Sequence, residues 1–325
     1  MKSIVQNEYQ FKDEYSKREE LLARCTRHII GDLKSSWGKG IGKVERKPII
    51  KEQQIVLTKY LESLIVNKRV ASDVTVFVYI QFLCSFCDKV RKPFSQMNNE
   101  DIIKYFADQH RANASHNSII SRQMMLRRFF KWFTDEDKPK IMKGLEGRLK
   151  KRILDVTKLL ETEDIKKMVE DSDCNRNACL IMALYEGGLR NGELCNIKLE
   201  DVKYDDGEYY ITVNGKTGKR TLLFKDSVPY LDKLLNEHPH RSNKQAPLFY
   251  DLKRRYKGLG IQAVYHIIKK VSNWSQVSQN KKVWPHLLRH SRAWHLVKYN
   301  NFNERDLRLF FGWSSTSDMP NHYLH

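Results

Sequence analysis

The chain has 325 residues, 41% of them hydrophobic, so it exceeds the usual size of a single domain and can bury a substantial core. Its 58 Lys and Arg residues against 39 Asp and Glu give a formal net charge of +19, which favours a polyanionic partner and makes nucleic acid a better candidate than a membrane surface or an acidic protein. The amino terminus lacks the apolar core of a secretory signal, and the longest apolar stretch, residues 75–87, is too short to cross a bilayer, so we expect a soluble, cytoplasmic protein without a membrane partner.

Residues 1–54 form an amino-terminal extension to which the sequence assigns no function. A charged helical pattern comes first, and a basic segment with three glycines, residues 37–43, interrupts it. These glycines follow no strand and open no clear helix. The segment therefore reads as a flexible link rather than a phosphate-binding loop.

Residues 55–135 read as consecutive helices without convincing strands. Asn98 followed by Asp101 predicts one helix start, and Ser115 predicts another. In the helix after Ser115, apolar side chains recur on one face and predict core: Ile119, Leu126, Phe130 and Phe133. The opposite face carries basic side chains, namely Arg122, Arg127, Arg128 and Lys131. They are either ordinary solvated charge or contacts to a DNA backbone, and we treat them as candidate DNA-binding residues.

One Cys-x-x-Cys pair, Cys84 and Cys87, lies inside an apolar helical pattern of this region. No second pair stands at zinc-finger spacing, although Cys25 and His28 are distant candidates for further ligands. Six cysteines in a chain of this length also do not make a disulfide framework. Buried thiols are therefore expected rather than a metal site.

Residues 136–151 combine proline, glycines and six basic residues, which is the composition of a basic linker between two domains. Residues 152–325 then mix helices with a short hairpin. Thr162 predicts a helix start, residues 178–185 an apolar helix, and Gly187-Gly188 a break. Alternating apolar residues at 209–213 and 222–224 flank a glycine-containing turn, which predicts a small antiparallel sheet.

Polar residues that suit phosphodiester chemistry are spread through this last region in a fixed order. Arg190 follows the glycine break at a predicted helix start, where the helix dipole adds to its charge. Lys216 and Lys219 project from the hairpin turn, and Lys216 is the candidate general acid for the leaving 5′ oxygen. We expect Lys219 and Arg220 to contact DNA. Taken singly, each of these residues is more often a solvated surface charge.

A second group lies near the carboxyl end. Pro285 predicts a helix start that places His286 and Arg289 on one face, so that Arg289 can share a phosphate with Arg190. Tyr323 is the candidate nucleophile. Its phenol ionises only near pH 10 in water, and we expect the neighbouring cations to make the phenolate easier to reach.

Taken together, these residues resemble the tyrosine recombinases of the phage integrase superfamily. The resemblance covers the last half of the chain through the arginine motif, the hairpin lysine, the His-x-x-Arg box, the Gly312-Trp313 position and the tyrosine. The tail from Gly312 to His325 is similar to archaeal members in particular. The helical region 55–135 resembles the family's core-binding domain less specifically.

The resemblance implies a fold that is mainly α with a small antiparallel β-sheet, arranged as a two-domain C-shaped clamp with the catalytic domain at 152–325. It implies that Tyr323 attacks the scissile phosphate, Arg190 and Arg289 bind it, Lys216 and His286 move protons, and Trp313 supports the phosphate. A 3′-phosphotyrosyl intermediate conserves bond energy, so no metal or nucleotide cofactor is implied. The implied partners are double-stranded DNA, at the nucleoid, and further copies of the chain in a tetramer on two DNA sites.

Two other functions use similar residues. A type IB topoisomerase would relax DNA without exchanging partners, and the helical domain before the linker argues for recombination instead. A DNA-binding protein that kept the fold and lost the chemistry is also conceivable, because a fold does not fix a function, but the complete residue set argues against it.

Overall fold

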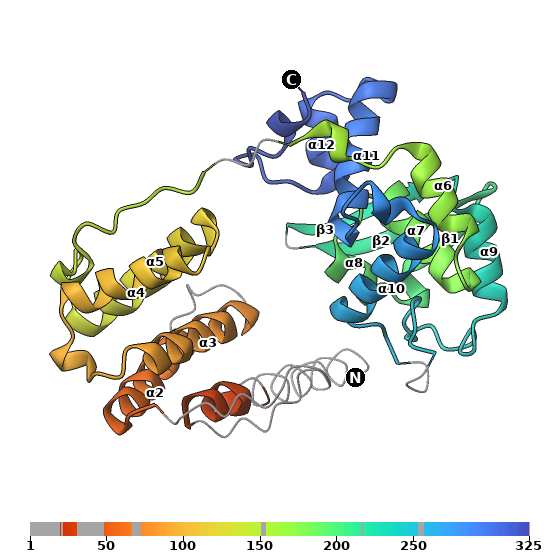
Figure 1. Ribbon diagram of the computed structural model, residues 1–325. Helices are drawn as coiled ribbons and strands as arrows, with labels where there is room; N and C mark the ends of the chain where they lie inside the picture. The colour runs from red at the N-terminus through yellow and green to blue at the C-terminus, as the bar shows by residue number, and fades with distance from the viewer. Residues whose placement is uncertain are drawn as a thin grey trace. The chain divides into compact units, whose positions relative to one another are not determined.

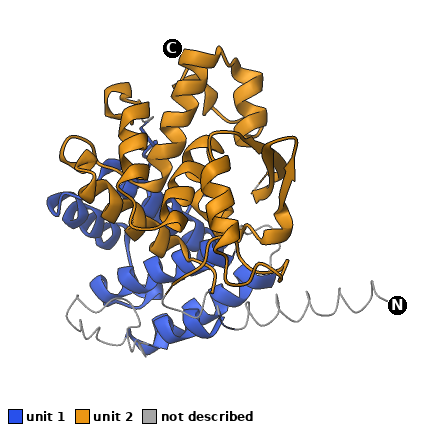
Figure 2. Cartoon of the chain, turned by 90° about the vertical axis from the view of Figure 1, so that its right-hand side faces the viewer, with its two compact units in different colours: residues 1–151 blue, residues 152–325 orange. Residues whose placement is uncertain are grey.

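The computed structural model describes residues 20, 22–30, 49–66, 73–150, 154–215, 217–252 and 257–324. The chain divides into two compact units, unit 1 (residues 1–151) and unit 2 (residues 152–325) (Figure 2). Helices predominate, and one three-stranded antiparallel sheet accompanies them in the described part of the chain. This composition of elements confirms the predicted fold class. No helix within the described ranges is long and apolar enough to span a membrane.

Unit 1 is built from helices (Figure 1). Both helix starts that the sequence predicts here are confirmed. Asn98 accepts a hydrogen bond from the backbone N–H of Asp101, and Asp101 returns one, while Ser115 accepts one from Ser118. The elements are α2 (Lys51–Val66), α3 (Asp73–Lys89), η1 (Phe94–Gln96), α4 (Asn99–Arg111), α5 (His116–Thr134) and η2 (Lys140–Met142).

The core of unit 1 uses the face of α5 that the sequence predicts. Ile119, Leu126 and Phe130 are buried, and Phe133 is half-buried beside them. Cys84 and Cys87 are buried in the same core, which confirms them as interior thiols. No group of three or more His, Cys, Asp or Glu side chains suited to a metal ion was found in the described residues.

Apolar residues beyond two of the predicted boundaries, at residues 54 and 136, pack into the same core as residues 55–135. Cys25 and Ile29, from the extension, are buried there, and α2 begins before residue 55. Met142 and Leu145, from the predicted linker, are buried there too. The side chain of Asn99 donates to the carbonyls of residues 141 and 143, which attaches this segment to α4. The glycine-rich segment 37–43 lies outside the described residues.

Unit 2 contains the sheet and the remaining helices (Figure 1). They are η3 (Val156–Lys158), α6 (Thr162–Glu170), α7 (Asn175–Glu186), α8 (Asn191–Asn196), η4 (Leu199–Asp201), β1 (Val202–Asp205), β2 (Glu208–Gly215), β3 (Gly218–Phe224), α9 (Val228–Asn236), α10 (Ile261–Trp274), η5 (Val277–Gln279), α11 (Pro285–Asn300), α12 (Glu304–Phe311) and η6 (Pro320–His322). The predicted helix starts at Thr162 and Pro285 are confirmed.

The sheet runs in the order β1-β2-β3, and both pairs are antiparallel. Gly215 pairs with Gly218 at the end of the predicted hairpin, and the inward residues Tyr209, Ile211 and Val213 are buried as their alternation predicts. The sequence did not predict β1, because this edge strand buries no side chain fully. Asp206 and Gly207, both with positive φ, form the tight turn that joins β1 to β2.

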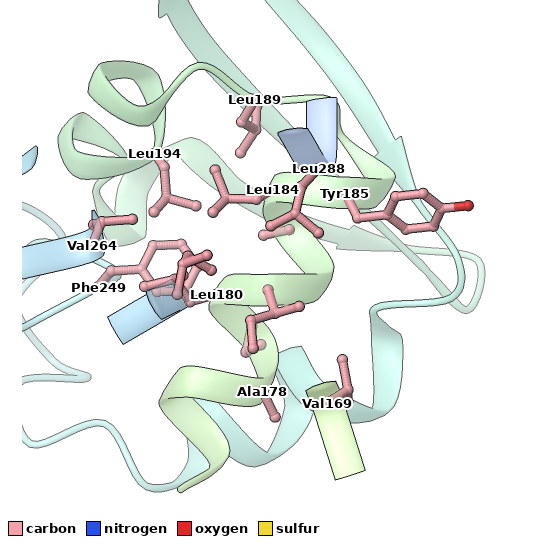
Figure 3. Packing of buried hydrophobic residues seen from close by; sticks show 14 of the residues in the cluster. Val169, Ala178, Leu180, Leu184, Tyr185, Leu189, Leu194, Phe249, Val264 and Leu288 are labelled. Atoms are coloured by element: carbon pink, nitrogen blue, oxygen red, sulfur yellow. The ribbon is translucent and has the colours of Figure 1, made fainter. Parts of the chain in front are cut away.

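Helix α7 lies at the centre of the unit 2 core and packs against α6, α9 and α11. Figure 3 shows its residues Leu180 and Leu184 facing Leu194, Val264 and Leu288 from other helices. A helix that is apolar on most sides is buried on most sides, as the sequence of α7 requires. The glycine turn before Arg190 therefore begins directly at the end of a helix that is buried in the core.

Candidate active site

Arg190 is positioned by a local turn between α7 and α8. Gly188 adopts a φ of +53°, and a Cβ there would lie 2.3 Å from the ring of Phe311, so the turn needs glycine for both its conformation and its packing. Arg190 then stands directly before α8, and its backbone N–H donates to Oε2 of Glu193 at 2.8 Å. The predicted glycine break and helix start are therefore confirmed.

Arg289 lies on α11, one turn after Pro285, with only 2% of its surface exposed. Its Nη1 donates to the carbonyl of Gly188 at 2.5 Å and its Nη2 to the carbonyl of Phe311 at 2.8 Å. The guanidinium carbon lies 4.8 Å from the ring centre of Phe311 and 5.6 Å from that of Trp313. These contacts fix the guanidinium in one orientation.

The carboxylate of Glu193 brings the two predicted phosphate-binding arginines together. Arg190 Nη1 lies 2.7 Å from Oε1, and Arg289 Nη1 lies 4.0 Å from Oε2. Burial acts to raise the pKa of Glu193, but hydrogen bonds from Arg220 and Arg190 outweigh it and hold this pKa at about 2. Glu193 is therefore ionised at neutral pH and compensates positive charge where an anionic phosphate is expected to bind.

His286 stands in the first turn of α11 with its side chain exposed, three residues before Arg289. Although His286 keeps contact with solvent, the protein atoms packed around its ring desolvate it in part, and this desolvation, followed by the charges of Arg289 and Arg190, lowers the pKa of its imidazole. His286 and Arg289 are three residues apart on α11, so the two side chains lie on the same side of this helix. The imidazole is neutral at neutral pH and can accept or donate a proton.

Tyr323 is placed near Arg289 but is enclosed. Its side chain is 1% exposed, its ring stacks on Trp313 with 5.9 Å between centroids and 5° between planes, and its hydroxyl forms a hydrogen bond with Nδ1 of His290. Burial raises the pKa of this phenol despite the opposing charge of Arg289. The expectation that neighbouring cations ease its ionisation is therefore wrong for this conformation, because desolvation of the phenolate outweighs their attraction.

Lys216, the predicted general acid, lies outside the described residues. Its two neighbours are described. Thr217 donates through Oγ1 to the carbonyl of Gly312 at 2.7 Å, and Gly215 lies against Glu193. The ends of the hairpin turn are therefore adjacent to Arg190, whose Nη2 donates to the same Gly312 carbonyl at 3.2 Å.

The predicted DNA-binding residues differ in their surroundings. Lys219 is exposed on β3, whereas the Arg220 side chain is 11% exposed and binds both oxygens of Glu193. On α5, each of the four predicted basic residues has a partner within unit 1, and of these four only Arg128 and Lys131 are exposed. These partners are Gln109 for Arg122, the Leu145 carbonyl for Arg127, the Tyr79 ring for Arg128 and Asp137 for Lys131.

Sequence reasoning missed two residues of the site, Glu193 and His290. Glu193 stands three residues after Arg190, and a Glu at this spacing after a helix start is a recognised capping signal that could have identified it. His290 directly follows Arg289, but nothing in the local sequence links it to Tyr323, which is 33 residues away.

An arginine pair on a buried carboxylate, a neighbouring histidine and an adjacent tyrosine offer the groups that a protein needs to bind a phosphate and to attack it with a covalent nucleophile. A model of the phage integrase family matches residues 155–325, which is more than half of the chain. The chain belongs to this family, and so to the tyrosine recombinase superfamily.

Individual relatives agree with this membership. Tyrosine recombinase XerA of Pyrococcus furiosus is 29% identical over 252 residues, covering 75% of this chain and 80% of the relative. Two solved structures share the fold. The XerH recombinase bound to its difH substrate has a TM-score of 0.62 at 18% identity, covering 94% of this chain and 91% of the other. A lambda integrase tetramer bound to a Holliday junction has a TM-score of 0.61 at 15% identity, covering 83% and 76%.

Proposed function

We propose that this protein is a site-specific DNA recombinase that cuts and rejoins strands through a 3′-phosphotyrosyl bond to Tyr323. Its family membership supports recombination over simple DNA relaxation or DNA binding without chemistry. The observation that carries the proposal is the arrangement around Glu193, where Arg190 and Arg289 meet beside His286. Two guanidiniums in fixed orientations can hold one phosphate and favour the charge that develops on it during attack.

The proposed reaction is a transesterification at phosphorus. The Tyr323 hydroxyl gives up its proton to His286 as its oxygen attacks phosphorus, the bond from phosphorus to the 5′ oxygen breaks, and Lys216 donates a proton to that oxygen. A 5′ hydroxyl of a partner strand then attacks the phosphotyrosine and releases Tyr323. One phosphodiester is exchanged for another, so the reaction needs no nucleotide cofactor or metal to supply energy.

The described position of Tyr323 adds one step to this scheme. Its hydroxyl is bonded to His290 in a buried site, so this bond must break before the oxygen can reach a phosphate. We therefore place a rearrangement of the segment after Trp313 before the cleavage step.

Double-stranded DNA at the nucleoid in the cytoplasm is the proposed partner, with Lys219, Arg128 and Lys131 as exposed candidate contacts. Strand exchange needs two cleaved sites held together, and we propose a tetramer on two DNA sites. A lambda integrase of the same fold has been solved as a tetramer on a Holliday junction, which supports this assembly.

A nicked suicide substrate tests the proposal. Cleavage near the nick releases a short oligonucleotide that carries the free 5′ hydroxyl. Because this fragment diffuses away, the strand cannot be rejoined, and the covalent adduct accumulates and is seen on a denaturing gel. The adduct must disappear with Tyr323→Phe, and one that survives this change excludes Tyr323 as the nucleophile. Efficient relaxation of a supercoiled plasmid without a recombination site would instead favour a topoisomerase.

A further inference from the structure

Consecutive carbonyl groups at the carboxyl end of α12 accept hydrogen bonds from three different arginines. The last carbonyls of a helix lack intrahelical partners and carry partial negative charge, so guanidiniums suit this position. The contacts are Arg220 Nε to Phe310 O at 3.0 Å, Arg289 Nη2 to Phe311 O at 2.8 Å and Arg190 Nη2 to Gly312 O at 3.2 Å. Two of these arginines are the proposed phosphate ligands, and the third, Arg220, has no role in the reaction proposed above.

Arg220 differs from the other two in what it binds. Its Nη1 and Nη2 donate to Oε1 and Oε2 of Glu193 at 2.9 and 2.8 Å, in the paired geometry that a planar guanidinium forms with a carboxylate. All three of its side-chain nitrogens therefore donate to protein acceptors. Arg220 thus attaches β3 at once to α8 and to the end of α12, instead of presenting its charge to DNA.

The turn of the hairpin is fixed by the same neighbours. The Thr217 hydroxyl and Arg190 share the Gly312 carbonyl. A Cβ on Gly215 would lie 2.4 Å from Oε1 of Glu193 and 3.2 Å from Nη1 of Arg220, so β2 approaches the carboxylate as closely as a backbone can. Movement of Gly215 or Thr217 relative to Arg190 therefore disturbs the packing of Gly215 against Glu193 and Arg220 or the Thr217 hydrogen bond to the Gly312 carbonyl.

We propose that Arg220 is a positioning residue for the general-acid step: it holds Gly215 and Thr217, the two described neighbours of Lys216, beside Glu193 and the end of α12. This inference rests on the proposed function, because it takes Lys216 as the acid that protonates the leaving 5′ oxygen. Loss of Arg220 leaves Arg190 and Arg289 with their own contacts to Glu193 and α12. It should therefore impair proton donation more than phosphate binding.

A change of leaving group separates these two effects. In a suicide substrate with sulfur in place of the bridging 5′ oxygen, the 5′ thiolate departs without a proton, because a thiol is a far stronger acid than an alcohol. We expect Arg220→Ala to slow adduct formation about 100-fold on the oxygen substrate, which is the size of a general-acid contribution, and less than about 3-fold on the sulfur substrate. Arg220→Lys keeps the charge but not the paired geometry, so it should rescue only part of the loss.

Two further variants complete the test. Lys225→Ala breaks an exposed ion pair with Glu208 on the same sheet and should leave both rates unchanged. Thr217→Val removes an exposed hydroxyl contact without unpairing Glu193, and it should show a weaker loss with the same substrate preference, which decides the matter if Arg220→Ala does not fold. Equal loss on both substrates, or no loss on either, overturns the positioning role. Failure of the unaltered protein to form any adduct would count against the proposed function instead.

Discussion

The hydroxyl of Tyr323 forms a hydrogen bond with Nδ1 of His290, and the surroundings of each residue favour its neutral form. Burial raises the pKa of the phenol, and burial together with His286 and Arg289 lowers the pKa of the His290 imidazole to about 4. A neutral phenol can donate to a neutral imidazole nitrogen. Tyr323 is therefore held in its neutral form by a buried hydrogen bond, and the proposed attack on a phosphate requires that this bond break.

The lowered pKa of His290 predicts how the stability of the protein depends on pH. In the unfolded chain this histidine takes up a proton below about pH 6.5, whereas in the folded protein it stays neutral down to about pH 4. Stability should thus fall as the pH falls from about 6.5 to about 4, by up to about 1.4 kcal/mol per pH unit from this site. Urea unfolding at several pH values gives the free energy of unfolding as a function of pH. Between pH 6.5 and pH 4 this free energy should fall less steeply for His290→Gln than for the unaltered protein. Equal dependence on pH in the two proteins would contradict the assignment.

Loss of the Glu193 carboxylate should be costly to the fold. Glu193→Gln leaves Arg190, Arg220 and Arg289 close together without their shared anion, and breaking a buried ion pair on one side costs about 3–5 kcal/mol. Glu170→Gln is the control, because Glu170 is exposed and pairs with Lys166 at 3.9 Å, and it should change stability by less than about 0.5 kcal/mol. Similar unfolding midpoints in urea for the two variants would argue against Glu193 as a structural centre of the site.

Arg289 should not be replaceable by lysine. Its two Nη atoms bind the carbonyls of Gly188 and Phe311, and an ammonium on a flexible stem cannot reproduce this fixed fork. We expect Arg289→Lys to slow adduct formation on the suicide substrate by about 100-fold or more, the loss typical of one preorganised donor to a developing charge. DNA affinity measured at the same salt concentration should change far less, and a matching loss of affinity would indicate a general binding role instead.

Alanine substitutions at two glycines with positive φ, Gly188 and Gly207, should distinguish the cost of a steric conflict from the cost of backbone strain. A Cβ at Gly188 would meet Phe311 at 2.3 Å, whereas one at Gly207 would meet nothing within 4 Å. Gly207→Ala should cost about 1 kcal/mol from conformation alone. Gly188→Ala adds a steric conflict beneath Arg190 and should cost about 3 kcal/mol and slow cleavage as well. Equal unfolding free energies for the two variants would show that Phe311 moves aside without cost.

Structural features that depend on residues close together in the sequence, such as helix starts and a β-hairpin, are predicted correctly. The helix starts at Asn98, Ser115 and Pro285 depend on the geometry of the residue at the cap and a few that follow it. The β2–β3 hairpin depends on the alternation of Tyr209, Ile211 and Val213, which is local as well. The order of the polar residues in unit 2 is likewise a property of the sequence alone, and it predicts the phosphodiester chemistry.

Only the tertiary structure decided what these residues bind. The Arg220 carbonyl contact joins residues 90 positions apart, and the Arg190 contact with Gly312 joins residues 122 apart, so no local pattern encodes either one. Which side chains become buried is also decided by tertiary packing. Tyr323 is enclosed by its neighbours, and Met142 of the predicted linker lies in the unit 1 core. Types of side chain and their order along the chain are local properties, whereas desolvation and the sharing of one carboxylate arise only after distant segments pack together.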